Sequence, residues 1–326
     1  MARYIAKRLG YMVFVFFIVS ILQFTLFKMI PGDPVLLQLE GQTFVNNEQR
    51  QMAYDAMSEK MGLNKPLYEQ YFIWITDTLQ GDFGNSTIHK KPVIDIVGAP
   101  MKNTVTLNII TLILVFSITI PLGIVTAVRK NSLFDKTTQI ATIVGYSMPT
   151  FVVALVFIVI FAVNLGLFPV SGTNSPGFSG TGMEAVWDSL KHMMLPIIVM
   201  TVSSLGGVTR YVRATMIDVL RMDYIRTARS KGLREKVVIY SHAFRNALIP
   251  VVTILTGWFI GIFSGSIVIE SIFAWNGLGN LLISSLRLQD YFVVLAMNMF
   301  YIILALLSNL FLDLIYGLID PRVKIS

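Results

Sequence analysis

The most informative charged segment of this sequence lies at positions 223–232, which read Asp-Tyr-Ile-Arg-Thr-Ala-Arg-Ser-Lys-Gly and are followed at once by Leu-Arg-Glu-Lys. This is the only long, strongly basic stretch in a chain of which 54% is hydrophobic and 14% is charged. It lies between two hydrophobic runs that are long enough to cross a membrane. Charged groups held in water beside a membrane can bind a soluble protein or anionic lipid headgroups. We interpret the segment as a docking element through which a membrane protein exchanges force with a soluble partner.

The sequence carries none of the common motifs for a phosphate-binding loop, a metal site or a serine nucleophile. The sequence has no Gly-x-x-x-x-Gly-Lys-Ser/Thr run that would hold a nucleotide phosphate. Its histidines, His89, His192 and His242, form neither a pair at helix spacing nor a His-Glu-x-x-His motif, and cysteine is absent. No Gly-x-Ser-x-Gly turn presents a serine nucleophile. We therefore expect no catalytic residue, metal site or cofactor, and no nucleic-acid partner.

The rest of the chain indicates an all-α integral membrane protein. Its mean hydropathy is +0.67, and its charged fraction of 14% compares with about 25% in soluble domains. A helix needs roughly 20 apolar residues to cross the hydrocarbon core, and continuous apolar runs favour helices over the alternating strands of a barrel. We expect six transmembrane helices, at 9–30, 104–128, 137–165, 193–211, 247–273 and 291–318.

Lysine and arginine are divided unevenly between the segments that join these runs. The segments on one side hold 17 of them, and the segments on the other side hold 9 in far more residues. The basic side comprises 1–8, 129–136, 210–247 and 319–326. Because basic residues collect on the cytoplasmic side of membrane proteins, we expect both termini in the cytoplasm. The first run is too long for a cleaved signal peptide and is expected to remain as an anchor.

The segment 31–103 is expected to form a helical extracytoplasmic insertion between the first two membrane helices. Prolines and glycines predict helices over 47–61 and 66–81 within it. The second of these helices carries an apolar face beside Trp74, made up of Tyr68, Tyr71, Phe72, Ile75 and Leu79. We expect this face to pack on the outer ends of the chain's own membrane helices. The alternative is that its rim contacts an external binding protein.

The basic loop 211–247 is predicted to hold a short helix between two long ones. That helix spans 223–230 and ends at Gly232, with Asp223 as a suitable N-cap. Arg229 and Lys231 suit the negative end of the helix dipole. A short helix fixed between two membrane helices would transmit a push to both of them. The alternative is that its basic residues only satisfy the cytoplasmic charge bias or bind lipid headgroups.

The basic loop also carries a recognisable pattern. Thr227-Ala-x-x-x-Gly232, followed by His242-Ala-Phe-Arg-Asn, resembles the Glu-Ala-Ala-x-x-x-Gly signature of permease subunits in binding-protein-dependent ABC importers. Arg226 and Thr227 replace Glu-Ala at its start, so no role of that glutamate is carried over. Arg245 stands where the general pattern has a proline.

Six further blocks extend this resemblance over nearly the whole chain and are most similar to the first permease of the oligopeptide, dipeptide and nickel branch. They read Met-Ile-Pro-Gly-Asp-Pro from 29, Leu-Asn-Lys-Pro-Leu-Tyr from 63, Gly-Asp-Phe-Gly from 81, Leu-Gly-Leu-Phe-Pro-Val-Ser-Gly from 165, Asn-Gly-Leu-Gly from 276, and Asp-Leu-Ile-Tyr-Gly-Leu-Ile-Asp-Pro-Arg from 313.

The resemblance implies the type I importer fold, with a first helix at 1–30, the insertion at 31–103 and a core permease domain at 104–326. It implies a bacterial or archaeal cytoplasmic membrane and four kinds of partner: a second homologous permease, two ABC ATPase subunits, an extracytoplasmic peptide-binding protein, and an oligopeptide or dipeptide substrate. Membrane lipid surrounds the assembly. The ATPase contact maps onto Asp223, Tyr224, Arg226, Thr227, Ala228, Arg229, Lys231 and Gly232.

The fifth and sixth runs contain candidate packing or path residues. One glycine occurs every four positions in the fifth run, at Gly257, Gly261 and Gly265. This spacing favours close helix packing over a role in lining the path. Glu270 is expected to face protein or water, or to pair with a basic residue of a neighbouring helix. Asn309 and Asp313 are expected to join helices near the cytoplasmic end of the sixth run.

Three other functions are weighed against a peptide importer. The same scaffold could import nickel or another small solute. The chain could instead be a channel or carrier that needs no ATPase, with its basic loop bound to lipid. An intramembrane enzyme is disfavoured, because the pairs of catalytic residues it would need are missing.

Overall fold

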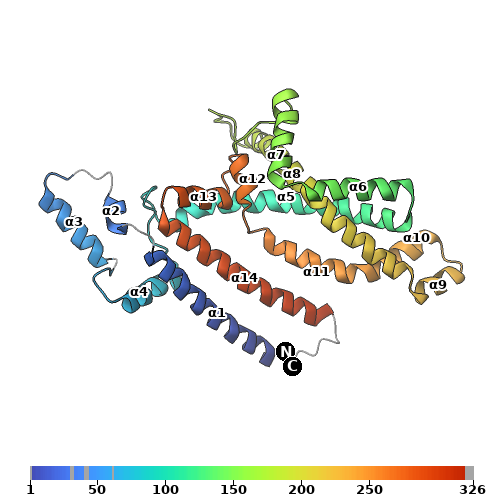
Figure 1. The fold of residues 1–326 in the computed structure, drawn as a ribbon, viewed down its shortest axis with the longest axis horizontal. Coiled ribbons are helices and arrows are strands. Elements are labelled where there is room, and N and C mark those ends of the chain that lie inside the picture. The colour runs from blue at the N-terminus through green and yellow to red at the C-terminus, as the bar shows by residue number, and fades with distance from the viewer. Residues whose placement is uncertain (1, 30–32, 40–43, 61, 320–326) are drawn as a thin grey trace. The chain divides into compact units, whose positions relative to one another are not determined.

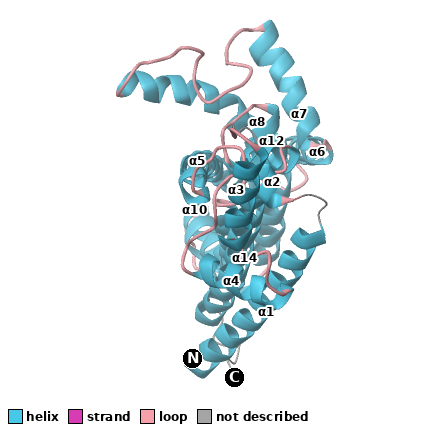
Figure 2. Ribbon diagram, turned by 90° about the vertical axis from the view of Figure 1, so that its left-hand side faces the viewer, coloured by secondary structure: helices cyan, strands magenta, loops and turns pink. Residues whose placement is uncertain are grey.

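The computed structural model describes residues 2–29, 33–39, 44–60 and 62–319. Within these residues the chain forms helices and loops, with one isolated antiparallel bridge between Asn85 and Pro92 and no strand (Figure 2). This confirms the all-α prediction. Four of the described helices are long and apolar enough to cross a membrane, and a bent pair of helices provides a fifth candidate.

Two compact units divide the chain (Figure 1). The first comprises Met1–Pro100 with Leu281–Leu310, and the second comprises Met101–Asn280 with Phe311–Lys324. The helices that lie wholly within the first unit are α1 (Ala2–Met29), α2 (Pro34–Leu39), α3 (Asn47–Lys60) and α4 (Leu67–Leu79). Three helices continue from one unit into the other: α5 (Val93–Val128), α13 (Leu278–Arg287) and α14 (Tyr291–Ile319).

The remaining helices belong to the second unit. They are α6 (Leu133–Ser147), α7 (Thr150–Phe157), the π-helix η1 (Ile158–Asn164), α8 (Met183–Leu220), α9 (Asp223–Ser230), α10 (Glu235–Val237), the π-helix η2 (Val238–Phe244), α11 (Arg245–Gly261) and α12 (Ile267–Ile272). The long helix α8 packs against α6, α7 and α11.

In the first unit, α1 contacts the start of α14 (Figure 1). The side-chain amide of Gln23 donates a 2.9 Å hydrogen bond to the carbonyl oxygen of Leu295, and the ring of Phe27 contacts that of Tyr291 at 5.9 Å. At the start of α14, the buried carboxylate of Asp290 accepts hydrogen bonds from the backbone and hydroxyl of Thr87 at 3.1 and 3.3 Å. These contacts attach the end of the insertion to the last long helix.

The insertion helices α3 and α4 lie where the sequence predicts them, and α2 was not predicted. The predicted packing face of α4 is only partly right. Ile75 is buried and Tyr71 is half-buried, but the other three members of the face are more than 60% exposed: Tyr68, Phe72 and Leu79. The buried side is rotated toward Gln70 and Thr78, because this side contacts α1.

Two of the six predicted membrane runs are not single helices. The run 137–165 is bent by 100° between Ser147 and Thr150. Met148 is extended there, with φ −82° and ψ 129°, because Pro149 disfavours the helical conformation in the residue before it. Pro149 then begins the next helix, where a missing N–H costs no hydrogen bond.

The predicted single helix over 247–273 is also wrong, since the chain leaves the helix after Gly261 and resumes it at Ile267. Glycine disfavours a helix interior, and Ser266 caps α12 by accepting a hydrogen bond from the backbone N–H of Ile269. The other four runs form continuous helices. The fourth, predicted at 193–211, is the core of the 38-residue α8.

Candidate functional site

The short basic helix α9 spans Asp223–Ser230, as the sequence predicts. Its start differs from the prediction in one respect. Met222, in an extended conformation, is the N-cap, and no side chain caps the helix. Asp223 is instead the first helical residue, where its negative charge still favours the helix dipole. Its carboxylate lies 3.8 Å from the guanidinium of Arg226, and both side chains are exposed.

One side of α9 is fixed in the core of the second unit. Ile225 is fully buried and Ala228 is 5% exposed. They belong to one hydrophobic cluster with Met216 of α8, and with Val238 and Ala243 of η2. These apolar contacts join α9 to the helices on both sides of it in the sequence. The helix is therefore held in place by packing, and a force applied to it passes to α8 and η2.

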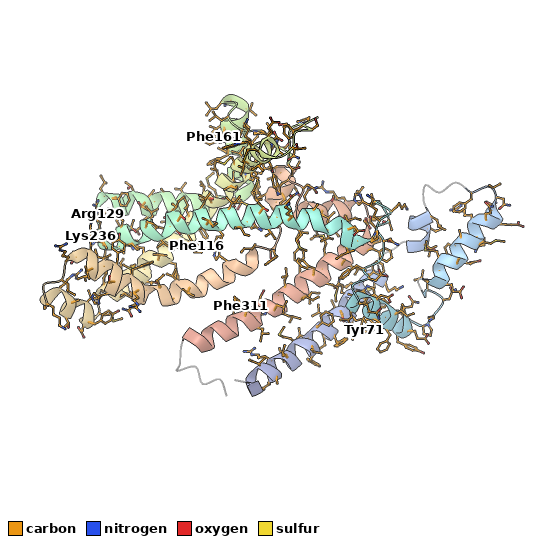
Figure 3. The ribbon with its side chains drawn as sticks, turned by 180° about the vertical axis from the view of Figure 1, so that it is seen from behind. Tyr71, Phe116, Arg129, Phe161, Lys236 and Phe311 are labelled. Carbon is orange, nitrogen blue, oxygen red and sulfur yellow. The ribbon has the colours of Figure 1, made fainter. Side chains whose placement is uncertain are left out.

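The other side of α9 is open to solvent and mainly basic. Its exposed residues include Tyr224, Arg226, Thr227, Arg229 and Lys231. Two more basic residues of the second unit, Arg129 and Lys236, are exposed toward the same end of this unit (Figure 3). Among the candidate coupling residues, only Ala228 is buried, so this small side chain serves packing while the others are available to a partner.

Gly232 ends α9 as predicted. Its φ of +73° is a left-handed conformation that favours glycine, and its N–H donates a 2.9 Å hydrogen bond to the carbonyl oxygen of Arg229. The guanidinium of Arg229 donates two hydrogen bonds to Glu235 of α10, at 2.7 and 3.3 Å. This pairing raises the pKa of Arg229 and lowers the pKa of Glu235. Arg229 thus connects α9 to α10.

A buried ion pair joins α6 to α8 in the same unit. The carboxylate of Asp135 is fully buried and accepts two 2.7 Å hydrogen bonds from the guanidinium of Arg213. Gln139 and the backbone N–H of Asn131 each add a hydrogen bond, both at 2.9 Å. Bidentate pairs of this kind restrict both partners. The residues of this pair were not among the predicted site residues, because nothing near either position in the sequence indicates its partner.

A cavity of about 320 Å³ lies beside α11 in the second unit. Gly257 and Gly261 line it together with Asn108, Met200 and Trp258. A Cβ atom built on either glycine would meet no atom within 4 Å. Among the described residues, these two glycines therefore leave open space on the side where a side chain would project.

Asn108 of α5 stabilises the point where α11 ends. Its side-chain amide lies within hydrogen-bonding distance of the carbonyl oxygens of Gly261, Ile262 and Ser264, at 3.3, 2.9 and 3.1 Å. The last carbonyls of a helix have no partner within the helix, so this amide supplies the missing donor. The break in the fifth run is thus held by a specific side chain.

The third glycine of the series, Gly265, lies in this break and not on α11. A Cβ atom there would be 2.9 Å from the Cα atom of Gly279. The two backbones are in direct contact, and neither position has room for a side chain. Gly265 therefore packs against the start of α13, which separates its role from those of Gly257 and Gly261.

Glu270 caps the start of α13. Its side chain is 1% exposed, and its carboxylate accepts hydrogen bonds from the N–H groups of Gly279 at 2.6 Å and Asn280 at 3.1 Å. The hydroxyl of Thr104 donates to the same carboxylate at 2.8 Å and accepts from the N–H of Leu278, also at 2.8 Å. Glu270 thus faces protein, and these partners are backbone and hydroxyl groups.

Comparisons with known proteins cover nearly the whole chain. Residues 119–325 match the family described as the inner membrane component of binding-protein-dependent transport systems, and residues 1–109 match the N-terminal family of such membrane components. The oligopeptide transport system permease protein AppB of Bacillus subtilis is 37% identical, and the match covers 99% of this chain and all of AppB. The chain belongs to this family of inner membrane components.

Two further relatives of this membrane component come from Escherichia coli K12. They are the dipeptide transport system permease protein DppB, 35% identical, and the glutathione transport system permease protein GsiC, 34% identical. Each match covers 99% of both chains. Among solved structures, a chain of the MetNI methionine ABC transporter is 15% identical with a TM-score of 0.49, and the match covers 68% of this chain and 97% of that chain.

The two candidates in the sixth run remain predictions for this membrane component. Asn309 is exposed on α14, and Asp313 lies on the same helix, with its side chain outside the described part. Part of the last sequence block, at 320–322, also lies outside the described residues. Within the described residues, no group of three His, Cys, Asp or Glu side chains could hold a metal ion.

Proposed function

We propose that this membrane component is one permease subunit of an ATP-driven importer for oligopeptides or dipeptides. The peptide class is suggested by the relatives AppB and DppB, whose names specify oligopeptide and dipeptide transport. The observation that carries the proposal is the exposed basic side of α9, whose opposite side is fixed in the core at Ile225 and Ala228. A helix presented in this way can receive a partner and pass its movement on.

In the proposed assembly, this chain and a second homologous permease form the path, and two ATPase subunits bind on the cytoplasmic side. The exposed residues of α9 contact one ATPase. When the ATPases close on ATP, α9 moves with them, and α8 and η2 follow because they pack against it. The protein then shifts between two arrangements that bind its partners differently, which is the thermodynamic requirement for such coupling.

The proposed topology has six crossings of a bacterial or archaeal cytoplasmic membrane, with both termini and α9 in the cytoplasm. The bent pair α6 and α7–η1 supplies the third crossing. The fifth is centred on α11, and η2 leads into it from the cytoplasmic side. The cavity beside Gly257 and Gly261 is the part of this chain that best suits a path, because these glycines leave space that a second permease or a peptide can fill.

The function is tested by uptake into proteoliposomes that contain the complete transporter and its binding protein. We expect ATP-dependent uptake of labelled peptides of two to five residues. Arg226→Glu reverses an exposed charge on α9 and should lower uptake about tenfold, the effect of losing roughly 1.4 kcal/mol of binding free energy. Gly232→Pro should do the same, because proline cannot adopt the positive φ at this position. ATP hydrolysis should continue.

The matched control is Lys191→Glu, which reverses an exposed charge near the start of α8, at the other end of that helix from α9, and should leave uptake unchanged. Normal uptake by both α9 variants would show that the ATPase contact lies elsewhere. If the transporter takes up radioactive Ni²⁺ and peptides do not compete with this uptake, the substrate is a metal ion and not a peptide. Uptake by the chain alone, with no ATPase present, would show that it is a channel or carrier.

A further inference from the structure

The insertion helix α4 lies against the part of α1 that crosses the membrane. The hydroxyls of Tyr71 and Ser20 are 2.7 Å apart, and the ring of Phe24 contacts those of Tyr71 at 5.6 Å and Trp74 at 5.7 Å. All four residues belong to the first unit. The helix α4 is therefore held beside α1 by its buried side.

The position of these contacts along α1 indicates how deep α4 lies. By length and composition, the part of α1 that can cross a membrane is Ile5–Met29. Phe24 is five residues from its end and Ser20 is nine, which correspond to about 7.5 Å and about 13.5 Å at a rise of about 1.5 Å per residue. At the level of Ser20, α1 exposes apolar side chains, with Ile21 at 51% and Leu22 at 57%. The contacts thus lie below the membrane end of α1, at a level where lipid surrounds it.

The exposed side of α4 is apolar along one stripe. Tyr68 and Leu79 are each 64% exposed and Phe72 is 63% exposed. At about 100° per residue, these three residues lie within about 40° of one another on the helix. They are the members of the predicted apolar face that do not pack against α1. In water, such a stripe would be unfavourable, whereas Tyr suits the membrane–water interface, and Phe and Leu are typical of the buried face of an interfacial helix.

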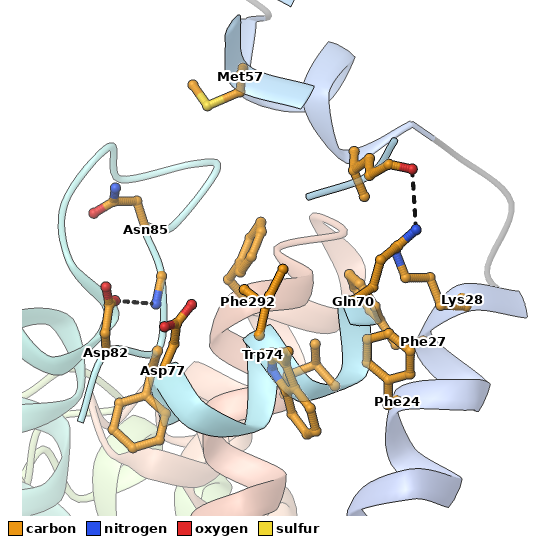
Figure 4. Close-up of a pocket in the computed structure, with 15 residues that line it drawn as sticks. Phe24, Phe27, Lys28, Met57, Gln70, Trp74, Asp77, Asp82, Asn85 and Phe292 are labelled. Carbon is orange, nitrogen blue, oxygen red and sulfur yellow. Dashed lines mark hydrogen bonds between the residues drawn. The ribbon is translucent and has the colours of Figure 1, made fainter. Parts of the chain in front are cut away.

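The opposite side of α4 is charged. Asp77 lies about 160° from the centre of the apolar stripe, at about 100° per residue, and lines a pocket of about 230 Å³. Figure 4 shows Asp77 and Asp82 on one side of this pocket and Lys28 and Gln70 on the other. Charged groups that line an open pocket require water. The helix therefore has an apolar side and a side that faces water, in addition to the side that contacts α1.

We propose that α4 lies in the boundary between the headgroups and acyl chains of the leaflet on the insertion side, with Tyr68, Phe72 and Leu79 in contact with lipid. Interfacial amphipathic helices bury their apolar face about 5–10 Å into this boundary, which agrees with the level of Phe24 on α1. The insertion is then fixed to the membrane surface, and the pocket with Asp77 opens toward water.

Because the chain contains no cysteine, a single introduced cysteine reports one position. The test uses the full-length chain in nanodiscs, with any companion subunits made cysteine-free, and a bimane label at Phe72→Cys. The matched control is Asp77→Cys on the other side of the same helix. Nitroxide-labelled phosphatidylcholine should quench the label at 72 several-fold more than the label at 77, and aqueous iodide should show the opposite preference.

Equal quenching of both positions by iodide would overturn the proposal, since the stripe would then lie in water. Protection of position 72 from both quenchers would also overturn it, because a protein partner, such as the second permease, would then cover the stripe. If Phe72→Cys does not fold, Tyr68→Cys and Leu79→Cys report on the same stripe and are read in the same way.

Discussion

At the scale of single residues, the second unit uses polar side chains to hold the backbone in place where helices begin or end. Glu270 and Thr104 together accept hydrogen bonds from the first three backbone N–H groups of α13. The side-chain amide of Asn108 donates hydrogen bonds to the carbonyl oxygens around the end of α11. Hydrogen bonds to a charged group contribute about 1.5–3 kcal/mol each. The start of α13 therefore depends on Glu270 more than on its own short sequence.

The glycines of the fifth run give a prediction at this scale. Gly265→Ala should lower the free energy of unfolding by about 1–3 kcal/mol, the usual cost of overpacking, because its Cβ atom would strike the backbone of Gly279. Gly257→Ala is the matched control. The added Cβ atom meets open space, and the substitution removes a glycine from a helix interior. The free energy of unfolding should therefore stay the same or rise by about 0.5–1 kcal/mol.

Thermal unfolding of both variants in nanodiscs measures the difference. Equal losses for Gly265→Ala and Gly257→Ala would contradict the separate roles assigned here. They would instead support a continuous row of glycines packed against another helix, as the four-residue spacing alone suggests.

At the scale of elements, α6, α8 and α9 form one mechanical group. The helix α9 is attached to α8 by apolar packing, and α8 is attached to α6 by the ion pair of Asp135 and Arg213. A movement of α9 can thus reach α6 without passing through a loop. The contact of Arg229 with Glu235 adds a connection to α10, although an exposed pair of this kind contributes only about 0–1 kcal/mol.

The buried pair can be tested by a double-mutant cycle. Asp135→Leu alone should destabilise the protein by about 3–5 kcal/mol, because it leaves the charge of Arg213 without its partner, and Arg213→Met alone is the other single variant of the cycle. The double variant Asp135→Leu with Arg213→Met removes both charges and should recover most of the loss. Thermal unfolding of the single and double variants gives the coupling free energy. Additive effects of the two substitutions would show that the pair does not join α6 to α8.

At the scale of the whole molecule, the division of basic residues between the loops predicts which side of the membrane each loop faces. Two exposed lysines allow a test, Lys65 in the insertion and Lys231 after α9. We expect a membrane-impermeant maleimide to label Lys65→Cys in intact spheroplasts. Lys231→Cys should react only after the membrane is opened. Labelling of both positions from the same side would contradict an orientation with α9 inside and the insertion outside.

Local features of the sequence were sufficient to predict much of this protein. Continuous apolar runs predicted α1, α5, α8 and α14, because a helix in lipid must satisfy its own backbone and expose apolar side chains. The bounds of α9 followed from Gly232 and from the change of polarity around it. The sequence blocks indicated the family, since a fixed order of short motifs along the chain needs no structure to be seen.

Only the tertiary structure showed contacts between distant positions. Thr104 and Glu270 are 166 residues apart, and Asp135 and Arg213 are 78 residues apart, so neither pair has a local signal. The break after Gly261 was missed because hydropathy continues through it, and the helix ends where Asn108 and Gly279 reach the backbone. For α4, periodicity predicted an apolar face, but the contact with α1 decided which part of that face is buried and which part remains exposed.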